Sequence, residues 1–68
     1  MELQINNQKF QFEQATVSIQ MMLDTHWLKQ QKGIAVAINS RVIAKSDWAT
    51  YYLSESDDIL LITATQGG

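Results

Sequence analysis

The spacing of the hydrophobic residues changes along this chain from the period of a strand to that of a helix and back. Over residues 2–13 the hydrophobic residues alternate with polar ones on both sides of Asn6-Asn7: Leu3, Ile5, Phe10 and Phe12. A period of two is typical of a strand with one buried face, and asparagine accepts the positive φ angles that a tight hairpin turn requires. The sequence therefore predicts an amino-terminal β-hairpin.

A single segment has the helical period. Between residues 17 and 29 the hydrophobic side chains share one broad face of a helix: Val17, Ile19, Met21, Met22, Leu23, Trp27 and Leu28. Thr16 and Ser18 are both candidate N-caps, because a hydroxyl oxygen can accept a hydrogen bond from a first-turn amide. Lys32 followed by Gly33 is typical of the region just beyond a helix. We expect the helix at about residues 17–29.

Short apolar segments separated by polar turns make up the rest of the chain. They predict a strand at 34–38, a turn at Asn39-Ser40, a strand at 41–44, a helical turn at 45–48, a further extended segment at 50–53, a polar turn at 55–58 and a final strand at 59–63. Strands on both sides of one long helix indicate an α+β fold, in which a mixed β-sheet carries one main helix packed on one face.

The final strand is hydrophobic on both faces, since Ile59 and Leu61 alternate with Leu60 and Ile62. Such a strand is expected at the centre of a sheet. One long helix can cover only one face of that sheet, so the other face needs a different cover. A partner protein is the simplest candidate.

Composition and charge exclude several classes of function. Five basic and seven acidic residues give a net charge of −2, and the basic residues are scattered, so a phosphate backbone has no basic stripe to bind. The first residues lack the features of a signal peptide, and no apolar run approaches the ~20 residues that span a bilayer. We therefore expect no nucleic acid partner, no membrane and a cytoplasmic location.

No pattern within the body of the chain predicts a reaction centre or a metal site. Cysteine is absent, which excludes thiol nucleophiles and cysteine-ligated metals. His26, the only histidine, has no nucleophile patterned around it and is interpreted as a helix-surface residue beside Trp27. Glu55, Asp57 and Asp58 lack the spacing of a calcium loop and are interpreted as a solvated turn.

The carboxyl end of the sequence is different. Gly67 and Gly68 contribute no packing, and two residues without side chains can enter a narrow channel and bring the terminal carboxylate to another enzyme. We therefore divide the chain into a folded domain at 1–64 and a flexible tail at 65–68.

The order of elements and the tail together resemble the ubiquitin-like β-grasp family, and within it the ThiS-type sulfur carriers of thiamine biosynthesis. The resemblance covers the whole chain and is carried by Ile5-Asn6-Asn7, Thr16-Val17, Ala37-Ile38-Asn39, Val42, Trp48-Ala49, Ile59-Leu60-Leu61 and Gly67-Gly68. Three features depart from the family pattern: Ile43-Ala44 stands where a proline is frequent, Ser18-Ile19 begins the helix, and the last turn reads Glu55-Ser56-Asp57-Asp58. Either Ser56 adopts a positive φ there, or the turn is of another type.

The resemblance implies that this chain is a protein cosubstrate and not an enzyme. A ThiF-type adenylating enzyme would use ATP and magnesium to activate the Gly68 carboxylate, and a persulfide sulfur donor would convert it to a thiocarboxylate. Thiazole synthase would then take the sulfur for the thiazole ring of thiamine. Thr65, Gln66 and Gly67 would enter the partner's channel, and the chain itself would bind no cofactor and no metal.

The resemblance also implies a docking face for these partners. We assign it to Leu60 and Ile62, with Ile59 and Leu61 under the helix. The reverse assignment is the alternative, because a shift of one residue exchanges the two faces of a strand. The alternative functions are a carrier like the small subunit of molybdopterin synthase, which is usually longer, and a β-grasp interaction module or protein modifier without sulfur chemistry.

Overall fold

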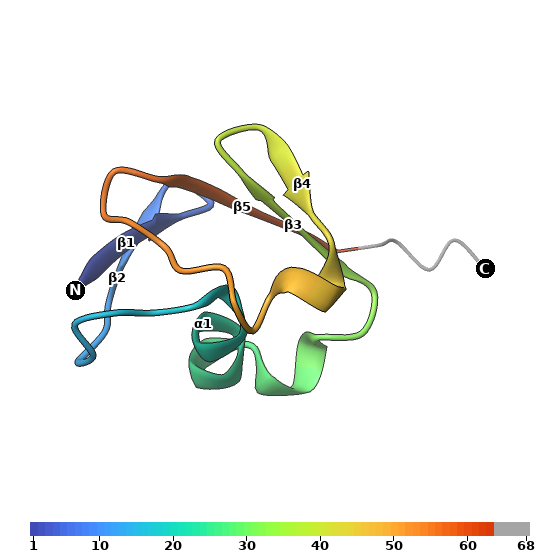
Figure 1. Ribbon diagram of the computed structural model, residues 1–68, viewed down its shortest axis with the longest axis horizontal. Helices are drawn as coiled ribbons and strands as arrows, with labels where there is room; N and C mark the ends of the chain where they lie inside the picture. Colours follow the sequence, from blue (N-terminus) through green and yellow to red (C-terminus); the bar gives the residue numbers. More distant parts are fainter. Residues whose placement is uncertain (64–68) are drawn as a thin grey trace.

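The computed structural model describes residues 1–63, except for the side chain of Gln30. Its elements are β1 (Glu2–Ile5), β2 (Gln8–Gln11), α1 (Ile19–His26), the 3-10 helix η1 (Leu28–Gln30), β3 (Ile34–Ile38), β4 (Arg41–Ile43), the 3-10 helix η2 (Lys45–Asp47) and β5 (Asp58–Thr63). The five strands form one mixed sheet, and α1 lies across one face of it (Figure 1). The α+β class predicted from the sequence is confirmed. The predicted domain end at residue 64 lies outside the described residues.

The last strand occupies the centre of the sheet, as its two hydrophobic faces predicted. The strand order is β2-β1-β5-β3-β4. β5 pairs in parallel with β1 and antiparallel with β3. The first and last strands of the chain are therefore neighbours, and β5 lies in the middle of the sheet (Figure 1).

Both hairpins turn through two residues with positive φ angles, as expected for type I′ turns. Asn6 and Asn7, between β1 and β2, have φ of 52° and 65°. Asn39 and Ser40, between β3 and β4, have φ of 52° and 71°. Asparagine adopts this region readily, whereas serine does so at a greater cost in conformational energy.

The helix has the cap that the sequence offered as one of two candidates. The Ser18 side chain accepts a hydrogen bond from the Met21 amide at 3.1 Å, and Ser18 itself is buried. The helix begins at Ile19 and ends at His26, a few residues inside each end of the expected range of about 17–29. Trp27 leaves the helical conformation (φ −129°, ψ 36°), and its ring packs against Phe10 with 5.3 Å between the centroids.

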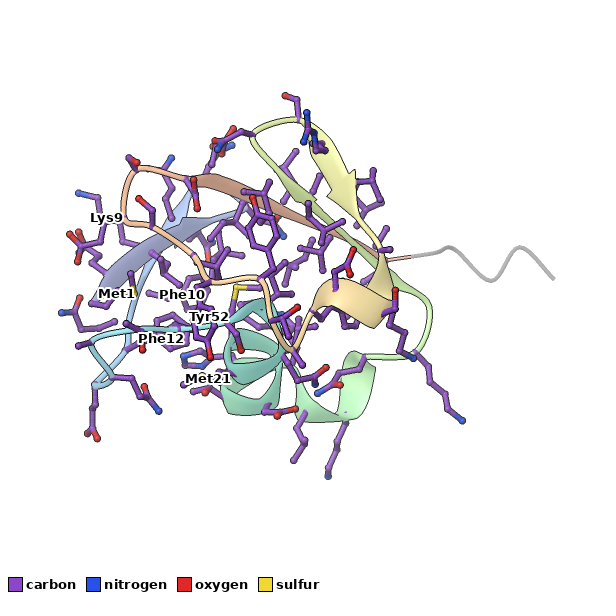
Figure 2. The ribbon with its side chains drawn as sticks, in the orientation of Figure 1. Met1, Lys9, Phe10, Phe12, Met21 and Tyr52 are labelled. Carbon is purple, nitrogen blue, oxygen red and sulfur yellow. The ribbon has the colours of Figure 1, made fainter. Side chains whose placement is uncertain are left out.

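The core lies between α1 and the helix-facing side of the sheet. Its fully buried side chains come from the sheet, the helix and the connecting segments: Leu3, Ile5, Val17, Ile19, Met22, Leu23, Val36, Trp48 and Ile59. Trp48 is the largest of them, and its indole N–H donates a hydrogen bond to the Ile43 carbonyl at 3.2 Å. Phe10, Phe12 and Met21 lie between the first hairpin and α1 (Figure 2).

The segment at 50–53, predicted to be extended, pairs with the residues before the helix and does not join the sheet. Tyr52 forms an isolated bridge with Ser18, and the Leu53 amide donates to the Val17 carbonyl at 2.8 Å. The start of the helix satisfies these backbone groups, so the extended segment pairs there instead of adding a strand to a sheet edge.

Ser56, in the acidic turn before β5, does not have a positive φ. The second alternative therefore holds, and the turn is of another type. The turn is closed by a backbone hydrogen bond from the Asp57 amide to the Ser54 carbonyl at 3.0 Å, and side chains add to it. An Asp57 carboxylate oxygen accepts from the Ser54 amide at 2.8 Å, and the Ser54 hydroxyl accepts from the Ser56 amide at 3.2 Å. This local capping satisfies backbone donors without the cost of a left-handed serine.

Candidate functional site: the open face of the sheet

The sheet face opposite α1 carries the hydrophobic residues that the sequence assigned to docking. Leu60 is 37% exposed and Ile62 is 52% exposed, whereas Ile59 and Leu61 are buried on the helix side. The predicted division of β5 into a covered and an open face is therefore confirmed. That Leu60 and Ile62 contact a partner stays a prediction.

Sequence reasoning missed a third member of this surface, Val42, which is 66% exposed. Val42 lies opposite Ala37 on β3, and Ala37 lies opposite Leu60 on β5, so the three residues form one row across the sheet. The alternation of Val42 with the buried Ile43, together with the two-residue turn at Asn39-Ser40, was the signal in the sequence that could have found it.

Alanine residues form the floor of this surface, which we call the apolar patch: Ala35, Ala37, Val42, Leu60 and Ile62. Ala35 lies opposite Ile62, and Ala37 lies between Leu60 and Val42. Because alanine ends at its β-carbon, the larger side chains on β4 and β5 stand higher than the strand between them. The patch therefore has small side chains on β3 between branched hydrophobic side chains on β4 and β5.

The other half of the open face is polar. On β1 and β2 its exposed positions carry Glu2, Gln4, Lys9 and Gln11, which pair across the strands as Glu2 with Gln11 and Gln4 with Lys9. Asp58 continues the row of Gln4 onto β5. The hydrophobic surface is thus confined to β3, β4 and the end of β5, beside the start of the carboxyl-terminal segment.

The residues that the sequence singled out for chemistry lie outside the described residues. These are Gly68, the proposed site of adenylation, and Thr65, Gln66 and Gly67, which were expected to enter a partner's channel. The apolar patch ends at Ile62, and Thr63 is the last residue of β5. Only one residue of β5 therefore separates the patch from the segment that ends in Gly68.

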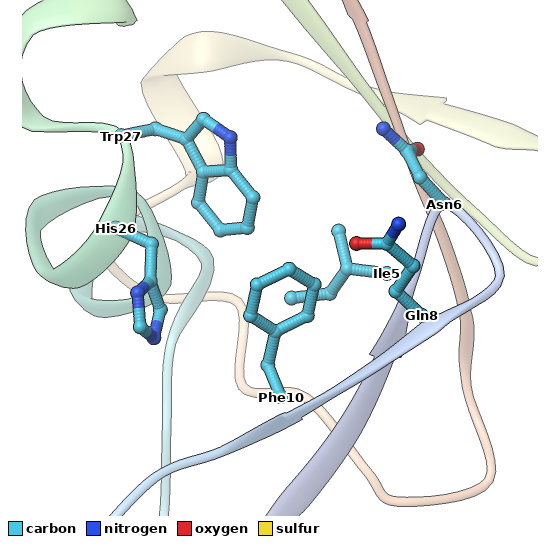
Figure 3. Close-up of a pocket in the computed structure, with 6 residues that line it drawn as sticks. All are labelled: Ile5, Asn6, Gln8, Phe10, His26 and Trp27. Carbon is cyan, nitrogen blue, oxygen red and sulfur yellow. The ribbon is translucent and has the colours of Figure 1, made fainter.

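A pocket lies on the helix side, between the first hairpin and the end of α1 (Figure 3). It has a volume of about 330 Å³ and is lined by Ile5, Asn6, Gln8, Phe10, His26 and Trp27. The His26 ring lies 5.3 Å from the Phe10 ring and 5.6 Å from the Trp27 ring, centroid to centroid. His26 is exposed beside Trp27, as interpreted from the sequence.

Two acidic side chains of the turn before β5, Glu55 and Asp57, accept structural hydrogen bonds. A Glu55 oxygen accepts from the Glu2 amide at 2.9 Å, and an Asp57 oxygen accepts from the Asn39 side chain at 2.9 Å. Within residues 1–63 no group of three histidine, cysteine, aspartate or glutamate side chains is arranged to hold a metal ion. No helix in this part of the chain is long and apolar enough to cross a membrane.

Two kinds of comparison with known proteins find matches, one with a family model and one with solved structures. The model of the ThiS family matches residues 3–68. The crystal structure of a thiamine biosynthesis protein (ThiS) from Geobacter metallireducens superposes with a TM-score of 0.83 at 17% sequence identity, and the alignment covers 100% of both chains. At that identity the likeness shows the fold. No curated protein matches the chain.

Proposed function

Because the chain belongs to the ThiS family, we propose that it carries sulfur in thiamine biosynthesis, as a thiocarboxylate on Gly68. One observation carries the proposal: the family match reaches residue 68 and so includes the terminal glycine pair together with the fold. The ubiquitin-like β-grasp arrangement supports it, since the strand that leads to the tail emerges from the centre of the sheet.

The proposed chemistry has three steps, all on the terminal carboxyl group of Gly68. In the first, a ThiF-type enzyme with ATP and magnesium joins the Gly68 carboxylate to AMP and releases pyrophosphate. In the second, the terminal sulfur of a protein persulfide attacks the carbonyl carbon and AMP leaves. A thiol then cleaves the sulfur–sulfur bond, so that one sulfur remains on Gly68 for transfer within thiazole synthase.

The chain's own contribution to these steps is binding and presentation. A terminal glycine pair presents a carboxylate with no side chain to obstruct its entry into a channel. The apolar patch lies one residue before that segment on β5, so an enzyme that covers the patch is placed at the start of the tail. We propose the patch as the docking surface for the adenylating enzyme and for thiazole synthase, with burial of Leu60, Ile62 and Val42 as the driving force.

The test of the proposed chemistry is a measurement of intact mass. The protein is incubated with a ThiF-type enzyme, magnesium, ATP, a persulfide donor and a thiol. The expected result is a mass gain equal to the exchange of one oxygen for sulfur. A variant that lacks Gly68 is the matched control, because its folded part is unchanged and its carboxylate lies one residue short of the reacting atoms.

Two results contradict the proposal. If neither an adenylate nor a mass gain forms with ThiF-type enzymes, the sulfur-carrier function is wrong. If the protein instead becomes joined to lysine side chains through Gly68, it is a modifier. Addition of thiazole synthase with its other substrates tests the pathway, since the thiocarboxylate should be consumed as the thiazole forms.

A further inference from the structure

The side chain of Asn6 bonds to the backbone of Leu61 in β5, and the hairpin turn itself does not require this contact. The Asn6 carboxamide oxygen accepts a hydrogen bond from the Leu61 amide at 2.9 Å, and its nitrogen donates to the Leu61 carbonyl at 3.4 Å. The two residues are 55 positions apart in the sequence. A single carboxamide therefore occupies both backbone groups of one residue in β5, as the peptide of a neighbouring strand would.

The position of this contact explains why it is needed. β1 pairs with β5 only at Gln4 with Asp58 and Ile5 with Ile59, and the Asn6 amide adds a last backbone hydrogen bond to the Ile59 carbonyl at 2.9 Å. The chain then turns away from β5 into β2. Beyond Ile59, the Asn6 side chain continues the pairing that the backbone of β1 has left (Figure 3).

Leu61 lies at the point of β5 that matters for the proposed function. Its neighbours in the strand are Leu60 and Ile62, the exposed side chains of the apolar patch on that strand. Thr63 and the carboxyl-terminal segment follow directly. A restraint on the Leu61 backbone therefore sets the direction of the docking side chains and of the strand that leads to Gly68.

We propose that Asn6 is a positioning residue for the sulfur-carrier reaction, acting through its hydrogen bonds to the Leu61 backbone. This inference rests on the proposed function, because the reaction at Gly68 gives the positioning its purpose. Asparagine meets both requirements of the site. It adopts the φ of 52° that the turn imposes, and its carboxamide offers the donor and the acceptor that one strand residue needs. Glycine would meet only the first, and aspartate would lack the donor when ionised.

The expected consequence is a change in binding and not in chemistry. Without the restraint, the end of β5 samples orientations in which the patch and the tail do not fit the enzyme together. The apparent affinity equals the intrinsic affinity multiplied by the fraction of molecules in the binding-competent state. The KM for the carrier should therefore rise, while kcat at saturation stays unchanged because the atoms at Gly68 are the same.

The experiment compares Asn6→Gly with Asn7→Gly. Both replace a turn residue with positive φ by the residue that best tolerates it, φ being 52° and 65° respectively, but only Asn6 bonds to Leu61. In Asn6→Gly we expect the KM for the carrier in the adenylation reaction to rise roughly fivefold to tenfold, the size set by loss of a modest hydrogen-bond energy. The Asn7→Gly variant should keep the wild-type KM, and both should keep the wild-type kcat.

A second measurement needs no enzyme. Hydrogen exchange of the free protein, read residue by residue by NMR, should show faster exchange of the Leu61 amide in Asn6→Gly than in Asn7→Gly. Circular dichroism establishes that both variants are folded. If Asn6→Gly does not fold, Asn6→Asp replaces it in the KM comparison, where a smaller rise is expected, since aspartate keeps the acceptor for the Leu61 amide and loses only the donor to the Leu61 carbonyl.

The outcomes separate the two proposals. An unchanged Leu61 exchange rate in Asn6→Gly, or an equal rise in KM in both glycine variants, overturns the role of Asn6. A fall in kcat without a change in KM also overturns it. If the wild-type protein is not adenylated, the proposed function fails, and the exchange measurement still decides whether Asn6 restrains β5.

Discussion

Replacement of Ile62 tests whether the apolar patch is a docking surface. The exposed fraction of the Ile62 side chain allows its contribution to the binding energy to be estimated. Ile62 is 52% exposed, so a partner that covers it removes about half of the side chain from water. Full burial of an isoleucine contributes ~1.5–3 kcal/mol, which leaves about 1 kcal/mol for docking. Ile62→Ala should therefore weaken binding about fivefold. Ile62→Glu should weaken it by roughly a hundredfold or more, since the carboxylate must also be desolvated.

The assay is titration of each variant with a catalytically inactive ThiF-type enzyme, monitored by calorimetry. Gln4→Glu is the matched control, because it adds the same charge to the same face on β1, outside the apolar patch. Circular dichroism should show the wild-type fold, with a cost in stability of about 1 kcal/mol for Ile62→Glu from its remaining contacts and the strand position. Equal weakening by Gln4→Glu, or wild-type affinity of Ile62→Glu, would refute docking through the patch.

Two further predictions concern the local chemistry that builds the scaffold. Ser18→Ala should reduce the free energy of unfolding by about 1 kcal/mol through loss of the N-cap, measured by urea denaturation, whereas Thr16→Ala should have almost no effect. Ser40→Gly should raise the free energy of unfolding by about 0.5–1 kcal/mol, because Ser40 has φ of 71° and glycine adopts that region without strain. Ser46→Gly, in η2, should lower it in the same titration, and a stabilisation there would contradict the argument.

Predictions from the sequence succeeded where a residue's own chemistry determines its conformation. The pair Asn6-Asn7 indicated a hairpin because asparagine tolerates positive φ, and both residues have it. The predictions were incomplete where two neighbouring residues could form the same interaction equally well. Thr16 and Ser18 offered the same hydroxyl, and the buried position of Ser18 beside Tyr52 selects it as the cap. The extended segment at 50–53 was recognised, but its pairing partner was not.

The candidate site divides in the same way. The alternation along β5 showed that Leu60 and Ile62 share one face, since a period of two relates neighbours within a strand. Which face α1 covers, and that Val42 joins the same surface, depend on packing and on the register between strands.

The sequence by itself thus determined the number and order of the main elements and the two faces of the last strand, because these follow from interactions between residues close together along the chain. Only the tertiary structure decided what lies against each face. The clearest case is Asn6, which the sequence marks as a turn residue and which the fold places against Leu61, 55 positions away. No local pattern encodes that contact, because it exists only once β1 and β5 are neighbours in the sheet.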